Sequence, residues 1–84
     1  MTLEELRVKI NQIDDDMMTL FLSRMAVSKA IGEFKKSQGV PVLDANREKT
    51  VLCRLKEKLN DDAMWPYYEA FMKEIMRLSK EIQA

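Results

Sequence analysis

The sequence of 84 residues contains no histidine, only one cysteine, two glycines and two prolines, and no net charge. The absence of histidine excludes imidazole acid–base chemistry, serine–histidine triads and histidine-ligated metal sites. The single cysteine, Cys53, forms no internal disulfide and suits a reducing compartment. Because 14 basic residues balance 14 acidic ones, the excess positive charge typical of nucleic-acid-binding proteins is also absent.

Long apolar runs are missing as well. No run approaches the roughly 20 residues of a membrane span, and no signal-peptide pattern opens the chain. We therefore expect a cytoplasmic protein that binds neither membranes nor nucleic acid. The composition, 46% apolar and 33% charged, is typical of one small domain covering residues 1–84. Because a monomer of this size buries only about 60–65% of its unfolded surface, we also expect it to oligomerise.

The few glycines and prolines divide the chain into three helical stretches, and no segment shows the alternation of a strand. The first stretch opens with Thr2 and Glu5 as a capping box, and Gly32 alone only weakens a helix. Residues 37–41 break this helix because they contain a glycine and a proline. Asp44 is a candidate N-cap for the second helix. The predicted fold class is all-α, with helices at about 3–36, 44–59 and 64–83.

The first stretch carries apolar residues at alternating spacings of four and three, the pattern of a coiled-coil-like contact. Its thirty-odd residues would extend about 50 Å at 1.5 Å per residue, whereas a compact chain of this length has a diameter of roughly 30 Å. A second copy packed along this row would cover the overhang, so we expect an intertwined homodimer. The positions of the row, called the seam below, are Leu6, Ile10, Ile13, Met17, Leu20, Arg24, Val27, Ile31 and Phe34.

Two basic residues of the first stretch lie where burial without a partner would be costly. Arg24 occupies a seam position, and Lys35 follows it by eleven residues. This spacing places Lys35 roughly 16 Å along and about 20° around the same helix, so both side chains point into one groove. Internal salt bridges, or a lysine that reaches solvent at the helix end, would explain the pattern without any ligand.

The other two stretches also carry polar residues at positions where apolar residues are expected. Asp44 and Glu48 head the apolar stripe of the second stretch, and Arg47 adjoins Glu48. Helix capping explains Asp44 but not Glu48, which could hold Arg24, Arg47 or a ligand hydroxyl. Ser79 interrupts the apolar row of the third stretch, and Gln83 follows it by four residues. A serine at such an interface is often only a small packing residue.

Together these residues resemble the all-helical class of chorismate mutase, and the resemblance covers nearly the whole chain. It implies an intertwined homodimer of three-helix chains, in which an arginine from the partner's long helix completes each active site. It also implies the rearrangement of chorismate to prephenate in phenylalanine and tyrosine biosynthesis, without a metal or cofactor. The residues that carry it are Arg7, Arg24, Lys35, the segment VPVLDANRE from Val40 to Glu48, and the pair Ser79 and Gln83.

By position, the resemblance implies that Lys35 and Gln83 are catalytic and donate to the ether oxygen of the breaking carbon–oxygen bond. Arg24 would hold one substrate carboxylate, and Arg7 of the partner chain would hold the other. On one straight helix Arg7 lies about 25 Å from Arg24, so the two can meet one small anion only from different chains. The remaining substrate-binding positions that it implies are Asp44, Arg47, Glu48 at the ring hydroxyl, and Ser79.

Two other functions fit part of this pattern. An isochorismate–pyruvate lyase uses a related helical dimer and the same kind of cationic site, and turnover of isochorismate rather than chorismate would identify it. A non-catalytic helical dimerisation or regulatory module would explain the seam, but not the inward placement of Arg24, Lys35, Glu48 and Gln83. Failure to bind a dianionic transition-state analogue would favour the module.

Overall fold

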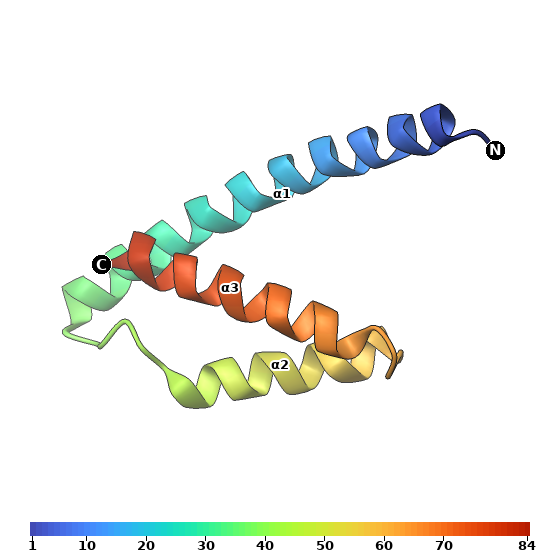
Figure 1. Cartoon of the computed structure of the whole chain (residues 1–84). Coiled ribbons are helices and arrows are strands. Elements are labelled where there is room, and N and C mark those ends of the chain that lie inside the picture. The colour runs from blue at the N-terminus through green and yellow to red at the C-terminus, as the bar shows by residue number, and fades with distance from the viewer.

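The computed structural model describes all 84 residues and contains three α-helices and no strand (Figure 1). The helices are α1 (Leu3–Gln38), α2 (Ala45–Leu59) and α3 (Trp65–Gln83). The all-α, three-helix fold predicted from the sequence is confirmed. The bounds differ slightly from those expected, since α1 continues to Gln38 and the other two helices each begin one residue later.

The helix ends are satisfied by the capping groups that the sequence indicates. Thr2 Oγ1 accepts a hydrogen bond from the backbone N–H of Glu5 at 3.1 Å. Gly39 follows α1 in the left-handed region at φ 68°, where the absence of a side chain avoids strain. Asp44 caps α2, and its Oδ1 accepts from the backbone N–H of Arg47 at 2.9 Å. These caps fix where α1 ends and where α2 begins.

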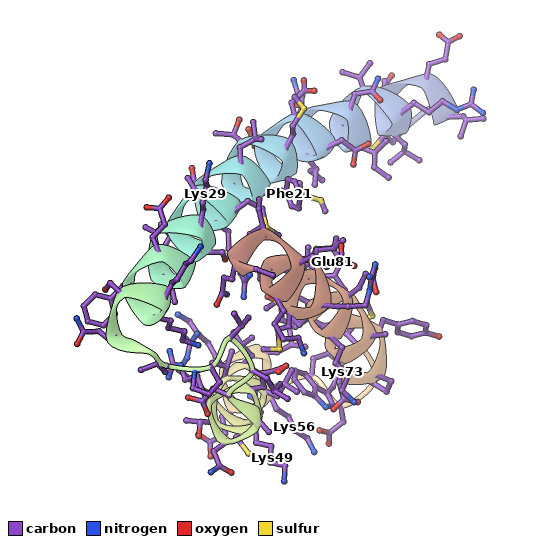
Figure 2. All side chains as sticks on the ribbon, turned by 90° about the vertical axis from the view of Figure 1, so that its left-hand side faces the viewer. Phe21, Lys29, Lys49, Lys56, Lys73 and Glu81 are labelled. Carbon is purple, nitrogen blue, oxygen red and sulfur yellow. The ribbon has the colours of Figure 1, made fainter.

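The α3 helix is the centre of the arrangement. It packs against both α1 and α2, which do not pack against each other (Figure 1). The N-terminal end of α1 projects beyond the other two helices (Figures 1 and 2). The molecule accordingly measures 54 × 26 × 16 Å, with a radius of gyration of 15.9 Å, against about 12 Å for a compact chain of this length.

The two faces of α3 differ in chemistry. Met72 and Met76 are buried. On the exposed face, Arg77 donates hydrogen bonds to Glu74 and Glu81, one helical turn away on either side. The hydrogen bond from Arg77 lowers the pKa of Glu74. The helix is thus amphipathic, and its apolar face is the one that packs.

Very little of the isolated chain is buried. Only seven of the 84 residues are buried, namely Met25, Ser28, Gly32, Trp65, Met72, Met76 and Ser79. The eight apolar residues of the seam remain between 44% and 68% exposed, the extremes being Ile31 and Leu20. No helix is both long enough and apolar enough to cross a membrane. The chain alone therefore lacks the core that a stable domain of this length requires.

Candidate functional site

A cavity of about 340 Å³ lies between the second half of α1, the start of α2 and the end of α3. This volume is within the range of small-ligand sites, about 300–1,000 Å³. The cavity, called the cationic cavity below, brings together seven of the eight residues expected in the site. These seven are Arg24, Lys35, Asp44, Arg47, Glu48, Ser79 and Gln83.

A second, larger hollow is chemically unsuited to be the site. This apolar groove, of about 850 Å³, lies between α1 and α3 and is lined mainly by methionine, leucine, isoleucine and aromatic side chains. Its only charged lining residues are Asp14 and Arg24. We therefore take the smaller cationic cavity as the candidate site, and treat the apolar groove as a packing surface.

Arg24 is oriented by two serines. Its Nη1 donates a hydrogen bond to Ser79 Oγ, and Ser28 Oγ donates to the same oxygen at 3.2 Å. Both serines are 5% exposed, so their hydroxyl groups lie buried between α1 and α3. Ser79 is therefore more than a small packing residue. Arg24 makes no ion pair, which leaves its half-buried guanidinium without an internal anion.

Lys35 is held from the loop that joins α1 to α2. Its Nζ donates to the backbone oxygen of Val42 at 3.0 Å, and the side chain is half-buried. An ammonium group has three donors, and no carboxylate lies within ion-pair distance of this one. The internal salt bridges that would explain Arg24 and Lys35 without a ligand are therefore not formed in the chain.

Glu48 does have a basic partner, but not one expected from the sequence. Lys80 Nζ lies 2.9 Å from Glu48 Oε1 and 3.3 Å from Oε2, and joins α3 to the start of α2. Lys80 also lines the cationic cavity. Lys80 was not predicted as a site residue, although its spacing of three residues from Gln83 places the two on one face of α3.

Gln83 reaches the cavity through a close crossing of two helices. A methyl group added at Gly32 would lie 2.7 Å from both the Cα and the backbone oxygen of Gln83. Gly32 was expected only to weaken the helix, but the absence of a side chain at this position lets the end of α3 lie directly on α1. Gln83 Oε1 is buried without a hydrogen-bond partner, which is uncommon for a buried polar atom in a folded protein.

Gly32→Ala should destabilise the protein, even though helix propensity alone predicts a gain of about 1 kcal/mol. The new methyl group meets backbone atoms of Gln83, which cannot rotate away, and overpacking of this kind costs about 1–3 kcal/mol. Thermal unfolding should therefore give a lower Tm than that of the unchanged protein. Ser23→Ala, at an exposed position of the same helix, is the control and should leave Tm nearly constant. A Tm for Gly32→Ala at or above the original value would contradict the proposed crossing.

The charges of the cationic cavity suit a small dianion. Arg24, Lys35, Arg47 and Lys80 face only two acidic residues, Asp44 and Glu48, so four basic groups exceed two acidic groups by two charges. Nowhere in the chain do three or more aspartate, glutamate or cysteine side chains gather to hold a metal ion. The arrangement can bind, orient and stabilise negative charge.

Arg7 is the one expected site residue that does not line the cavity. It is exposed near the start of α1, about 25 Å along the helix from Arg24. Figure 1 shows this end of α1 far from the crossing of α1 and α3. Within one chain, Arg7 and the cationic cavity are therefore separate.

Comparison with known proteins gave two matches. The family described as chorismate mutase type II matches residues 6–84, a range that includes all eight expected site positions. A chorismate mutase from Methanocaldococcus jannaschii is 34% identical over 55 residues, which cover 66% of this chain and 56% of that relative. The aligned part thus spans little more than half the length of the curated relative. No solved structure matches the chain.

Proposed function

The chain belongs to the chorismate mutase type II family, and from this membership we propose that it rearranges chorismate to prephenate. The proposal rests above all on the cationic cavity, where Arg24, Lys35 and Gln83 converge with no internal carboxylate bound to them. The reaction belongs to phenylalanine and tyrosine biosynthesis, and we place it in the cytoplasm.

The chemistry fits a chain without histidine. In this rearrangement one carbon–oxygen bond breaks and one carbon–carbon bond forms within the same molecule, without proton transfer or a covalent intermediate. The protein must hold a flexible dianion in its reactive chair, which fixed cations can do. It must also stabilise the negative charge that develops on the ether oxygen, which requires preorganised donors.

Arg24 and Ser79 form the carboxylate end of the proposed site. The hydrogen bond from Arg24 to Ser79 and the support from Ser28 hold the guanidinium in one orientation. Such a planar group binds a carboxylate through two parallel hydrogen bonds. Ser79 lies at the same end, where its hydroxyl contacts the carboxylate that Arg24 binds.

Lys35 and Gln83 supply the two donors to the ether oxygen. Lys35 comes from α1 and keeps two of its three donors after bonding to Val42. Gln83 comes from the last turn of α3, where the crossing at Gly32 holds it. Because each donor is anchored by a different contact, both are in place before charge develops.

The opposite end of the site is formed by α2. Glu48 accepts a hydrogen bond from the ring hydroxyl, and Asp44 shapes this end while it caps the helix. Arg47 supports the ligand and its neighbours. With an excess of two positive charges from one chain, the cavity matches the two carboxylates of chorismate before a partner adds another cation.

We propose that two chains form an intertwined homodimer along the seam, with Arg7 donated to the partner's cavity. Three observations support this assembly: the exposed seam, the scarcity of buried residues, and the 54 Å length of the molecule. A partner helix laid along the seam and the apolar groove would bury the projecting half of α1. Run antiparallel, it would carry Arg7 toward the other chain's cavity.

Analytical ultracentrifugation at micromolar concentration should give about twice the chain mass of 9.8 kDa. Ile13→Asp should shift this equilibrium toward monomer or unfolded chain, because it places a charge in the apolar seam. Asn11→Asp adds the same charge to the same helix outside the seam, and should leave the dimer intact. A folded 9.8 kDa monomer of the unchanged protein would remove both the dimer and the shared site.

The proposed function is tested by incubating the purified protein with chorismate and, separately, with isochorismate. We expect chorismate absorbance to fall as prephenate forms, and no pyruvate to appear from isochorismate. Release of pyruvate from isochorismate without prephenate formation would instead identify the lyase. No turnover of either compound, together with no binding of a dianionic transition-state analogue, would identify a non-catalytic module.

A further inference from the structure

Lys80 is the only basic residue of the cationic cavity that forms an ion pair within the chain. It contacts both carboxylate oxygens of Glu48, at 2.9 and 3.3 Å. The two side chains are 36% and 27% exposed, so the pair is partly shielded from solvent at the cavity wall.

The ion pair changes what Glu48 can bind. A carboxylate has about four acceptor positions, and Lys80 occupies one on each oxygen, which leaves room for a hydroxyl hydrogen. The charge of Glu48, however, is already balanced. A neutral hydroxyl group can therefore dock on Glu48, whereas a second cation at the same place would face the Lys80 ammonium a few ångströms away.

We propose that Lys80 determines specificity at this end of the site. Its ammonium group neutralises the negative charge of Glu48, so that the cavity accepts a ring hydroxyl and rejects a ring ammonium. This inference rests on the proposed function and on Glu48 as the residue that faces the ring substituent. Lys80 acts both through Glu48, whose carboxylate it positions, and directly, by repelling a cationic substituent.

The expected discrimination follows from the charges. Two like charges about 4 Å apart repel strongly at the effective dielectric constant of a protein surface, but the 36% exposure of Lys80 reduces this considerably. We therefore expect its removal to change relative specificity by about tenfold. Removal also lowers the excess positive charge of the cavity from two to one, so the KM for chorismate should rise.

The test compares kcat/KM for chorismate with kcat/KM for the analogue in which an amino group, protonated at neutral pH, replaces the ring hydroxyl. The ratio of these two constants measures relative specificity independently of overall activity. In Lys80→Met, which removes the charge but keeps a chain of similar length, the analogue-to-chorismate ratio should rise about tenfold. Lys80→Arg keeps the charge and should restore the ratio to near the wild-type value.

Lys73→Met is the matched control, because Lys73 lies on α3 (Figure 2), is 62% exposed and does not line the cavity. A ratio in Lys80→Met within twofold of wild type overturns the inference, as does an equal rise in Lys73→Met. If Lys80→Met loses helix content, Lys80→Gln is judged by the same criteria. Wild-type protein inert toward chorismate overturns the proposed function and this inference with it, whereas normal turnover with an unchanged ratio overturns this inference alone.

Discussion

Lys35→Ala should lower kcat for chorismate by about two to three orders of magnitude, the usual cost of losing one donor to a developing negative charge. The side chain is half-buried and makes a single hydrogen bond within the chain, to Val42. Its removal therefore breaks one loop contact and no ion pair. Circular dichroism should show unchanged helix content, while the absorbance assay shows the loss of turnover.

Lys36→Ala is the matched control for this prediction. Lys36 is adjacent, exposed and in the same last turn of α1, so its removal deletes the same charge from the same helix end. Its kcat should stay within about twofold of the unchanged protein. A Lys35→Ala protein that retains turnover within a few-fold of wild type would show that Lys35 does not stabilise the transition state.

The fold followed from local signals in the sequence. Capping residues and helix breakers mark the three helices, and each signal acts within a few residues of chain. Thr2 and Asp44 cap α1 and α2 as expected. The end of α1 was placed two residues early because the last turn continues until Gly39 adopts its left-handed conformation. Boundaries are set by such terminal details, which periodicity alone does not resolve.

The cavity was predictable in part for a similar reason. Helical spacing fixes which residues share a face, so Arg24 and Lys35 had to point to one side of α1, and Ser79 and Gln83 to one side of α3. The spacing of residues along one helix does not show how close that helix lies to another. The resemblance placed all eight residues in one site, and the structure gathers seven of them around one cavity.

The features that sequence reasoning missed all depend on contacts between helices. Glu48 could have paired with Arg24 or Arg47, yet the packing of α2 on α3 places it in an ion pair with Lys80. Gly32 weakens an isolated helix, and only the approach of α3 shows why a side chain cannot be accommodated there. In both cases the sequence indicated that the residue was unusual but not which residue it contacts, because that contact depends on tertiary packing.

Whether Arg7 completes the site of the partner chain also depends on packing, in this case between two chains. Mixing two inactive variants should test it. If each site combines its own Lys35 with the partner's Arg7, homodimers of Arg7→Ala and of Lys35→Ala each have two defective sites. A mixed dimer has one site with both defects and one with neither. Random reassortment of equal amounts makes about half of the dimers mixed, so roughly a quarter of all sites should regain full activity.

The two variants must be unfolded and refolded together, with chain exchange verified by mass labels, and then assayed with chorismate. Each variant refolded alone is the control, and a mixture left unrefolded should stay inactive until its chains exchange. Recovery cannot come from either parent, since neither chain carries both intact residues. If an exchanged mixture is no more active than its parents, Arg7 does not complete the partner's site. The cationic cavity, with its two excess positive charges, would then have to bind chorismate with the residues of one chain.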